Sequence, residues 1–138
     1  MISDGVVADA NVLLSAVVGK AAFRVFSEFK VPVHTTRFNA DEVEEYLPIL
    51  SAKYGIPLEI LQLQWTLLPL RIHAPESYRE QVEMAKRVLA SRDPDDAHLL
   101  ALARTLSLPL WSNDSDLADV GVQCHTTARL LKVLSSER

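Results

Sequence analysis

Three short apolar runs recur along the chain, and each is followed at once by polar residues of the kind that begin helices. They are Gly5 to Ala8, Val31 to Thr35 and Leu108 to Ser112. Short β-branched runs bounded in this way are typical of buried strands. A turn signal at Gly121 precedes a fourth predicted strand, Val120 to Thr126, and the run Leu70 to His73 between two prolines predicts a fifth.

Segments with helical spacing separate these predicted strands. They are Ala21 to Phe29, Arg37 to Tyr54, Pro57 to Leu68, Glu76 to Ser91, Asp95 to Ser107 and Thr127 to Leu134. Strands that alternate with helices of this length need crossover connections, which make the sheet parallel and cover both of its faces. We therefore expect an α/β fold, a three-layer α/β/α sandwich with a central parallel sheet. Pro48 lies inside one helical segment, so we expect that helix to kink or break there.

Length and composition fit one domain with one core. The 138 residues, 49% of them hydrophobic, supply enough apolar material for a single domain spanning 1–138. We expect neither a signal peptide nor a membrane span, because the N-terminus lacks a basic start and no apolar run is long enough. Cys124 is the only cysteine, so no disulfide can form within the chain. These features predict a cytoplasmic protein.

Acidic residues recur where the predicted strands end and the following helices begin. Asp9 ends the first strand, Asp114 follows the strand at Leu108 to Ser112, and Asp93 to Asp96 open a helix. A further group occupies the first turns of the helix after the second strand: Asp41, Glu42, Glu44 and Glu45. Because the carboxyl ends of parallel strands share one edge of the sheet, we expect acids that are far apart in sequence to meet there.

Helix capping is the alternative explanation for each of these acids. Aspartate is favoured at helix N-caps, and Asp93 followed by Pro94 fits such a cap well. Capping gives no reason, however, for four acidic groups to converge, and like charges within about 4–6 Å are costly unless a cation neutralises them. The polar residues beside the acids also offer oxygen ligands: Asn11, Ser112, Asn113 and Ser115. An all-oxygen set favours Mg²⁺ or Mn²⁺ over zinc.

No other catalytic arrangement has a local signature in the sequence. The histidines show no i, i+3 or i, i+4 pairing, so we expect packing or surface roles for His34, His73, His98 and His125. No Gly-rich phosphate loop and no Ser/His or Cys/His motif is present.

Three blocks of the sequence resemble the motifs of PIN domains, in the family's order. They are Asp9 to Ala16, Arg92 to Ala103 and Trp111 to Leu117. In the first block the acid is followed two residues later by Asn11, and in the third the hydroxyl of Ser112 precedes Asp114 by two. The resemblance covers nearly the whole chain, from the first strand to the final helix.

The resemblance implies a role for each matching residue. It makes Asp9 the first acid, Asp96 the third and Asp114 the fourth, with Asp93 and Asp116 as accessory carboxylates, Asp116 among the metal ligands, and Asn11 and Ser112 as supporting groups. For the second acid Glu42, just before Val43, fits best, and Glu45 is the alternative. Asp41 and Glu44 would then be solvated or capping charges.

The resemblance also implies an activity. PIN domains are ribonucleases that cleave RNA phosphodiester bonds with Mg²⁺ or Mn²⁺, and many small members are VapC-type toxins held inactive by an antitoxin. The net charge of −4 requires bound metal to make such a site attractive to phosphate. Arg24 and Arg37 are candidates to contact the RNA backbone, although ordinary solvated surface positions are the favoured interpretation of both.

Two other functions fit the same architecture. A receiver-type phosphotransfer domain also gathers aspartates at a sheet edge, but such a domain has a lysine after the last or next-to-last strand. At these two positions this chain has Ser112 to Asp114 and His125 to Thr127, with no lysine. A PIN-like binding module without turnover is the second alternative, and such modules typically lose acids that are present here.

The segment Ile56 to Leu70 holds more large apolar side chains than one inward-facing helix stripe needs. We expect the surplus, with Trp65 as an anchor, to cover a homodimer or antitoxin interface. A helix buried on all sides is the alternative.

Overall fold

The computed structural model describes residues 2–89, 94–118 and 120–137. Its centre is a five-stranded sheet in the order β3-β2-β1-β4-β5, and all neighbouring strands are parallel. The strands are β1 (Val6–Ala8), β2 (Val33–Thr36), β3 (Leu70–His73), β4 (Leu110–Trp111) and β5 (Cys124–His125). The predicted parallel sheet and all five predicted strands are confirmed, each strand being somewhat shorter than its apolar run or equal to it.

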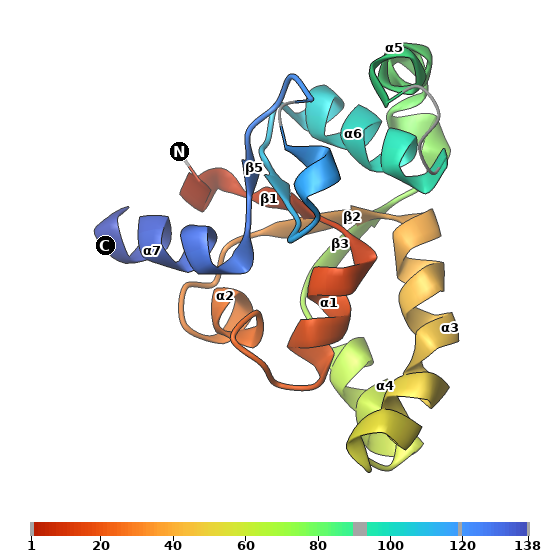
Figure 1. Ribbon diagram of the computed structural model, residues 1–138, viewed down its shortest axis with the longest axis vertical. Helices are drawn as coiled ribbons and strands as arrows, with labels where there is room; N and C mark the ends of the chain where they lie inside the picture. The colour runs from red at the N-terminus through yellow and green to blue at the C-terminus, as the bar shows by residue number, and fades with distance from the viewer. Residues whose placement is uncertain (1, 90–93, 119, 138) are drawn as a thin grey trace.

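Seven α-helices are assigned in the described residues, and they form layers on both faces of the sheet (Figure 1). They are α1 (Ala10–Val17), α2 (Phe23–Ser27), α3 (Arg37–Tyr54), α4 (Leu58–Leu67), α5 (Arg79–Leu89), α6 (Pro94–Leu106) and α7 (Thr127–Glu137); short 3-10 turns are η1 (Ile2–Asp4), η2 (Pro75–Ser77) and η3 (Ser115–Leu117). None of the described helices is long and apolar enough to cross a membrane.

Two apolar cores lie on opposite sides of the sheet. One joins α1, α2, α3, α4 and α7 to β1 side chains such as Val6 and Ala8. The other joins α5 and α6 to Val7 of the same strand. Because successive side chains of a strand point to opposite faces, β1 contributes to both cores and is buried at all three positions. The three-layer α/β/α architecture is therefore confirmed.

Helix α3 shows how local sequence sets an element's limits. Thr36 caps its start by accepting the amide N–H of Asn39, and Gly55 ends it in the left-handed conformation at φ 65°, which a glycine adopts without strain. Pro48 lies inside the helix, but the helix is continuous through it. Of the two expected outcomes, a kink or a break, the break is therefore wrong. Pro48 is exposed, so its ring faces solvent rather than a packed neighbour.

The orientation of α4 corrects one expectation. Trp65 is buried, with 9% of its surface exposed, and its indole N–H donates to the Glu44 carboxylate at 3.2 Å. It packs with Leu61 in the core and is not a surface anchor. The surplus apolar side chains are instead Ile60, Leu63 and Leu67, which are 49%, 54% and 65% exposed. The predicted surplus exists, on the face of α4 opposite Trp65.

Candidate active site

The first and fourth acids follow the two strands at the centre of the sheet. β1 pairs with β4 through Val7 to Leu110 and Ala8 to Trp111. The next residue, Asp9, donates its amide N–H to the Trp111 carbonyl at 3.2 Å, which continues the ladder by one bond. The chain leaves β1 toward β2 on one side and reaches β4 only later on the other. Such a switch point opens a crevice at the carboxyl ends of the strands, where ligands bind in parallel α/β sheets.

The Asp9 carboxylate is buried, and each of its oxygens accepts a hydrogen bond. Its Oδ1 caps α1 by accepting the Val12 amide N–H at 3.0 Å, and its Oδ2 accepts the hydroxyl of Ser112 in a short hydrogen bond. Burial raises the pKa of Asp9 most strongly, and the negative charge of Asp114 raises it further, against the lowering effect of these hydrogen bonds. Asp9 is therefore the N-cap of α1 and also a buried carboxylate whose ionised form is destabilised by its surroundings.

The Ser112 hydroxyl connects the two acids. Its oxygen accepts the amide N–H of Asp114 at 3.0 Å while its proton goes to Asp9. The Asp114 carboxylate is exposed and accepts the amide N–H of Asp116 at 2.9 Å, which shapes η3. Asn113 points elsewhere, because its side-chain oxygen accepts the Thr127 amide N–H at 2.8 Å. Of the polar neighbours considered as ligands, Ser112 lies in the site and Asn113 anchors α7.

Asn39 links the first acid's helix to the second acid's helix. Its Oδ1 accepts the amide N–H of Ala10 at 3.2 Å, and its Nδ2 donates to the Thr36 hydroxyl at 2.8 Å. The residue is 5% exposed, so both contacts are shielded from water. Sequence reasoning missed Asn39. A threonine at a strand end followed three residues later by asparagine would have suggested a cap, but not the contact with α1.

The acids of α3 differ in burial. Glu42 is half-buried beside the buried Val43, whereas Asp41 and Glu45 are exposed. Glu44 is exposed and accepts the Trp65 indole N–H. Burial thus distinguishes Glu42 from its alternative Glu45, and the choice of Glu42 as the second acid stays a prediction.

The acids of α6 reach the same edge from the other layer. Asp95 and Asp96 are half-buried in the first turn of α6. The starts of α1, α3 and α6 gather on one side of the sheet in Figure 1, and α3 contacts both α1 and α6. Asp93, expected as an accessory carboxylate, lies outside the described residues.

The donor set of this edge fits a hard divalent cation. Among the described residues, no three His, Cys, Asp or Glu side chains stand close enough to hold a metal ion as they are placed. The pair that does interact, Asp9 and Asp114, offers carboxylate oxygens, and the charge of Asp114 raises the pKa of Asp9. Oxygen ligands with mutual repulsion suit Mg²⁺ or Mn²⁺, which would remove that cost.

The histidines were expected to have packing or surface roles, and His34, His73 and His98 do pack against other rings, but each of the three also has a polar partner. His34 and His73, from the neighbouring strands β2 and β3, place Nδ1 and Nε2 at 2.9 Å. Burial lowers the pKa of both rings. His98 forms a second polar pair with Tyr78, and His125 is buried with no hydrogen-bond partner for either ring nitrogen among the described residues.

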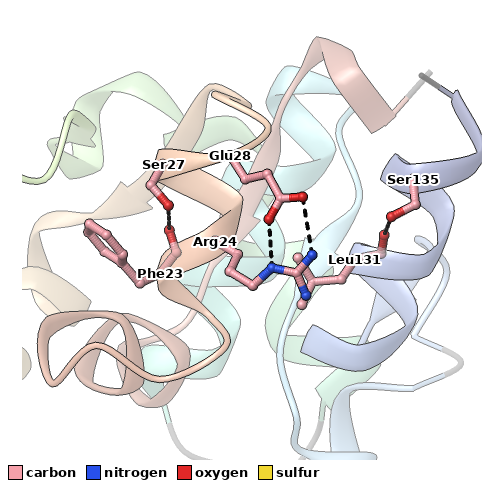
Figure 2. Close-up of polar contacts among 6 residues, drawn as sticks. All are labelled: Phe23, Arg24, Ser27, Glu28, Leu131 and Ser135. Carbon is pink, nitrogen blue, oxygen red and sulfur yellow. Dashed lines mark hydrogen bonds and ion pairs between the residues drawn. The ribbon is translucent and has the colours of Figure 1, made fainter.

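The two arginines proposed to contact substrate have different positions. Arg24 on α2 forms a two-point pair with Glu28, at 2.7 and 3.2 Å (Figure 2). α2 does not begin at the acidic edge, so Arg24 is an ordinary surface position. Arg37 is exposed and is the first residue of α3, next to that edge.

These features define a class of protein: a parallel α/β domain whose switch point carries carboxylates from several strand and helix ends. The model of the PIN domain matches residues 7–135, so the chain belongs to the PIN-domain family. This assignment decides against the receiver-type alternative. No curated protein matches the sequence.

Two solved structures share the fold at low sequence identity. A toxin-antitoxin complex from Klebsiella pneumoniae contains a chain that is 18% identical, with a TM-score of 0.64, over 88% of this chain and 97% of that one. The Mycobacterium tuberculosis toxin VapC20, which cleaves the sarcin-ricin loop, is 16% identical, with a TM-score of 0.57, over 85% and 95%. At these identities the similarity establishes the fold.

Proposed function

We propose that this protein is a metal-dependent endoribonuclease that hydrolyses RNA phosphodiester bonds. The observation that carries the proposal is the buried carboxylate of Asp9, held by Ser112 beside Asp114 at the switch point of the sheet. A buried charge with a like charge as neighbour is costly in the free protein and becomes favourable once a divalent cation binds. Membership of the PIN-domain family supports the same chemistry.

The residues take the following roles in this proposal. Asp9, Asp96 and Asp114 hold the cation directly or through water, with Asp116 and Asp93 as accessory acids and Asn11 in support. Bound Mg²⁺ or Mn²⁺ supplies an acidic water at neutral pH and charge stabilisation for the phosphate. Ser112 orients Asp9, since its hydroxyl donates to the carboxylate and is itself fixed by the Asp114 amide. Glu42 is either a ligand or the general base.

A toxin role in the cytoplasm is the biological setting we propose. The chain has the fold of VapC20, a toxin that cleaves the sarcin-ricin loop, and of a chain in a toxin-antitoxin complex. Its net charge of −4 makes RNA binding dependent on the metal, so EDTA should weaken binding as well as cleavage.

The proposal is tested with labelled RNA and purified protein, with Mg²⁺, with Mn²⁺ and with EDTA. We expect cleavage only with metal, and none by Asp9→Asn or Asp96→Asn, both of which should fold normally. Glu59→Gln, an exposed acid in the first turn of α4, is the matched charge control and should cleave like the wild type. RNA binding without cleavage in every metal would instead support the binding-module alternative.

We also propose that the exposed apolar face of α4 binds a protein partner, either a second copy in a homodimer or an antitoxin. Leu67 lines an apolar hollow of about 260 Å³ together with Phe23 and Phe26 of α2, and Leu63 lies one turn before it. A continuous exposed apolar surface of this kind is more often an interface than an accident.

Light scattering and pull-down with a candidate antitoxin test this surface. We expect Leu63→Glu and Leu67→Glu to abolish association while leaving the thermal midpoint nearly unchanged, because both side chains are more than half exposed. Gln62→Glu, exposed on the same helix, controls for added charge. A wild type that is monomeric and binds no antitoxin would refute the proposed interface.

A further inference from the structure

An aromatic ring stands exposed between the acidic starts of α3 and α6. Phe38 is 39% exposed, and its ring centroid lies 4.5 Å from that of His98. Phe38 precedes Glu42 by one helical turn, which places the two on the same side of α3. His98 follows Asp96 by two residues on α6, and the two helices contact each other. The Phe38–His98 pair therefore lies at the rim of the proposed active site.

Core packing accounts for only part of Phe38. It belongs to neither of the two apolar cores, although residues on the following turns of α3, such as Val43 and Leu47, do. Two fifths of the surface of this large apolar residue stay in water, and that part gains nothing from burial. The exposed part of the ring is free to take a planar partner.

A buried tyrosine holds the His98 ring in place. The Tyr78 hydroxyl lies 2.8 Å from His98 Nδ1, and only 1% of the Tyr78 surface is exposed. Burial raises the pKa of Tyr78 to about 12, so the phenol keeps its proton. This contact occupies Nδ1 and fixes the orientation of the imidazole ring. Nε2 has no hydrogen-bond partner in the described part of the chain, so it is the ring nitrogen left for a ligand.

We infer that Phe38 and His98 form a subsite for one unpaired nucleobase of the RNA substrate. The base stacks on the exposed face of Phe38, and His98 Nε2–H donates to a carbonyl oxygen or ring nitrogen on its edge. This inference rests on the proposed ribonuclease function. A base suits the location better than a phosphate, because the charge of Asp95 acts on His98 and Glu42 lies one turn from Phe38, whereas stacking needs no positive charge.

The test compares Phe38→Leu with Phe38→Trp in metal-loaded protein that cleaves short single-stranded RNA. Leucine keeps the apolar volume and removes the aromatic face, whereas tryptophan keeps an aromatic face. We expect Phe38→Leu to raise KM by about 5- to 150-fold, the range that base–aromatic stacking energies convert to at about 1.4 kcal/mol per tenfold. Phe38→Trp should restore the wild-type KM, and His98→Ala should raise KM where His98→Gln, which keeps an N–H donor, does not.

An abasic nucleotide separates base stacking from a structural role. RNA that lacks the base next to the cleaved bond should bind wild type as weakly as intact RNA binds Phe38→Leu, and combining both changes should add little. Strictly additive losses, or an unchanged KM for Phe38→Leu, would overturn the subsite while leaving the nuclease proposal intact. Loss of antitoxin binding alone by Phe38→Leu would assign the ring to a protein partner and overturn the subsite too.

A second measurement needs no variant of Phe38. RNA with 2-aminopurine at the same position, mixed with the non-cleaving Asp9→Asn protein and metal, should lose fluorescence as the base stacks. Unchanged fluorescence on saturable RNA binding would refute stacking. If the wild type neither binds nor cleaves RNA, the proposed function fails first, and the subsite falls with it.

Discussion

Replacing Asp9 with asparagine should abolish cleavage and yet stabilise the metal-free protein. The carboxylate is 8% exposed, its pKa is raised by burial and by Asp114, and each pKa unit gained on folding costs the folded state about 1.4 kcal/mol at neutral pH. Asparagine has the same shape, and its side-chain oxygen can still accept the Val12 amide N–H. The substitution therefore removes the charge and keeps the cap.

The gain in the free energy of unfolding is limited by the weaker hydrogen bond between Ser112 and residue 9 in the variant. With asparagine at position 9, Ser112 accepts from the new amide group and from the Asp114 amide, while its own proton loses the carboxylate acceptor. A neutral hydrogen bond contributes roughly 1 kcal/mol less than one to a charged group. We expect the removal of the buried charge to outweigh this loss, and each 1 kcal/mol of net gain would raise Tm by about 3–5 °C for a domain of this size.

The pH dependence of the stability difference between Asp9→Asn and the wild type tests whether the Asp9 charge destabilises the fold. A folded-state pKa above the unfolded value means that the folded protein binds this proton more tightly, so the penalty from Asp9 is absent at low pH and grows as pH rises through the folded pKa. The stability advantage of Asp9→Asn should therefore be largest at neutral pH and vanish below the ordinary aspartate value of 3.8. Thermal or denaturant unfolding in EDTA at several pH values measures it.

Two comparisons make the result decisive. Saturating Mg²⁺ should stabilise the wild type more than Asp9→Asn and reduce or reverse the difference, because only the wild type keeps the full ligand set. Ser112→Ala, which deprives the buried carboxylate of a donor, should instead cost about 1–3 kcal/mol. A loss of about 2 kcal/mol or more for Asp9→Asn at neutral pH in EDTA would refute the reasoning, since it exceeds the cost of a lost cap and would show that the charge itself stabilises the fold.

Three other outcomes follow from the structure. Burial lowers the pKa of His34 and of His73, so stability should fall as pH drops below the ordinary histidine value of 6.5; denaturant titrations should show a smaller fall for the double variant His34→Asn, His73→Gln. Asn39→Ala should cost about 1–3 kcal/mol, because it leaves the first amide of α1 buried without an acceptor, and a Tm equal to wild type would contradict the link between α1 and α3. Glu42→Gln should lower kcat far more than Glu45→Gln in the RNA assay, and the reverse order would make Glu45 the second acid.

The sheet was predictable from the sequence because its strands are short apolar runs with polar ends. The meeting of Asp9 with Ser112 and Asp114 followed from the same logic, since parallel strands share their carboxyl edge. Helix α1 was missed. Most of its residues are buried, including Val12, Leu13, Ala16 and Val17. The helix therefore has no wide polar face, and its sequence lacks the alternation of apolar and polar residues that predicts an amphipathic helix.

Contacts that depend on register or on helix rotation could not be read from the chain. The His34–His73 pair requires the alignment of Thr36 with His73 across β2 and β3, which no local pattern specifies. Trp65 was placed on the wrong side of α4 for a similar reason. The helix is apolar on both sides, so composition could not tell the side facing Leu61 from the side carrying Leu63.

Two helix caps at the same edge show that capping alone does not explain Asp9. Thr36 and Asp9 have similar extended backbones, with φ of −88° and −81°, and each side chain accepts the amide N–H three residues ahead. Both are buried, but Thr36 is neutral and its hydroxyl caps α3 without a charge. A serine or threonine would cap α1 equally well and avoid the cost of a buried carboxylate. The charge at position 9 is therefore surplus to the fold, and a bound cation is the partner that would make it favourable.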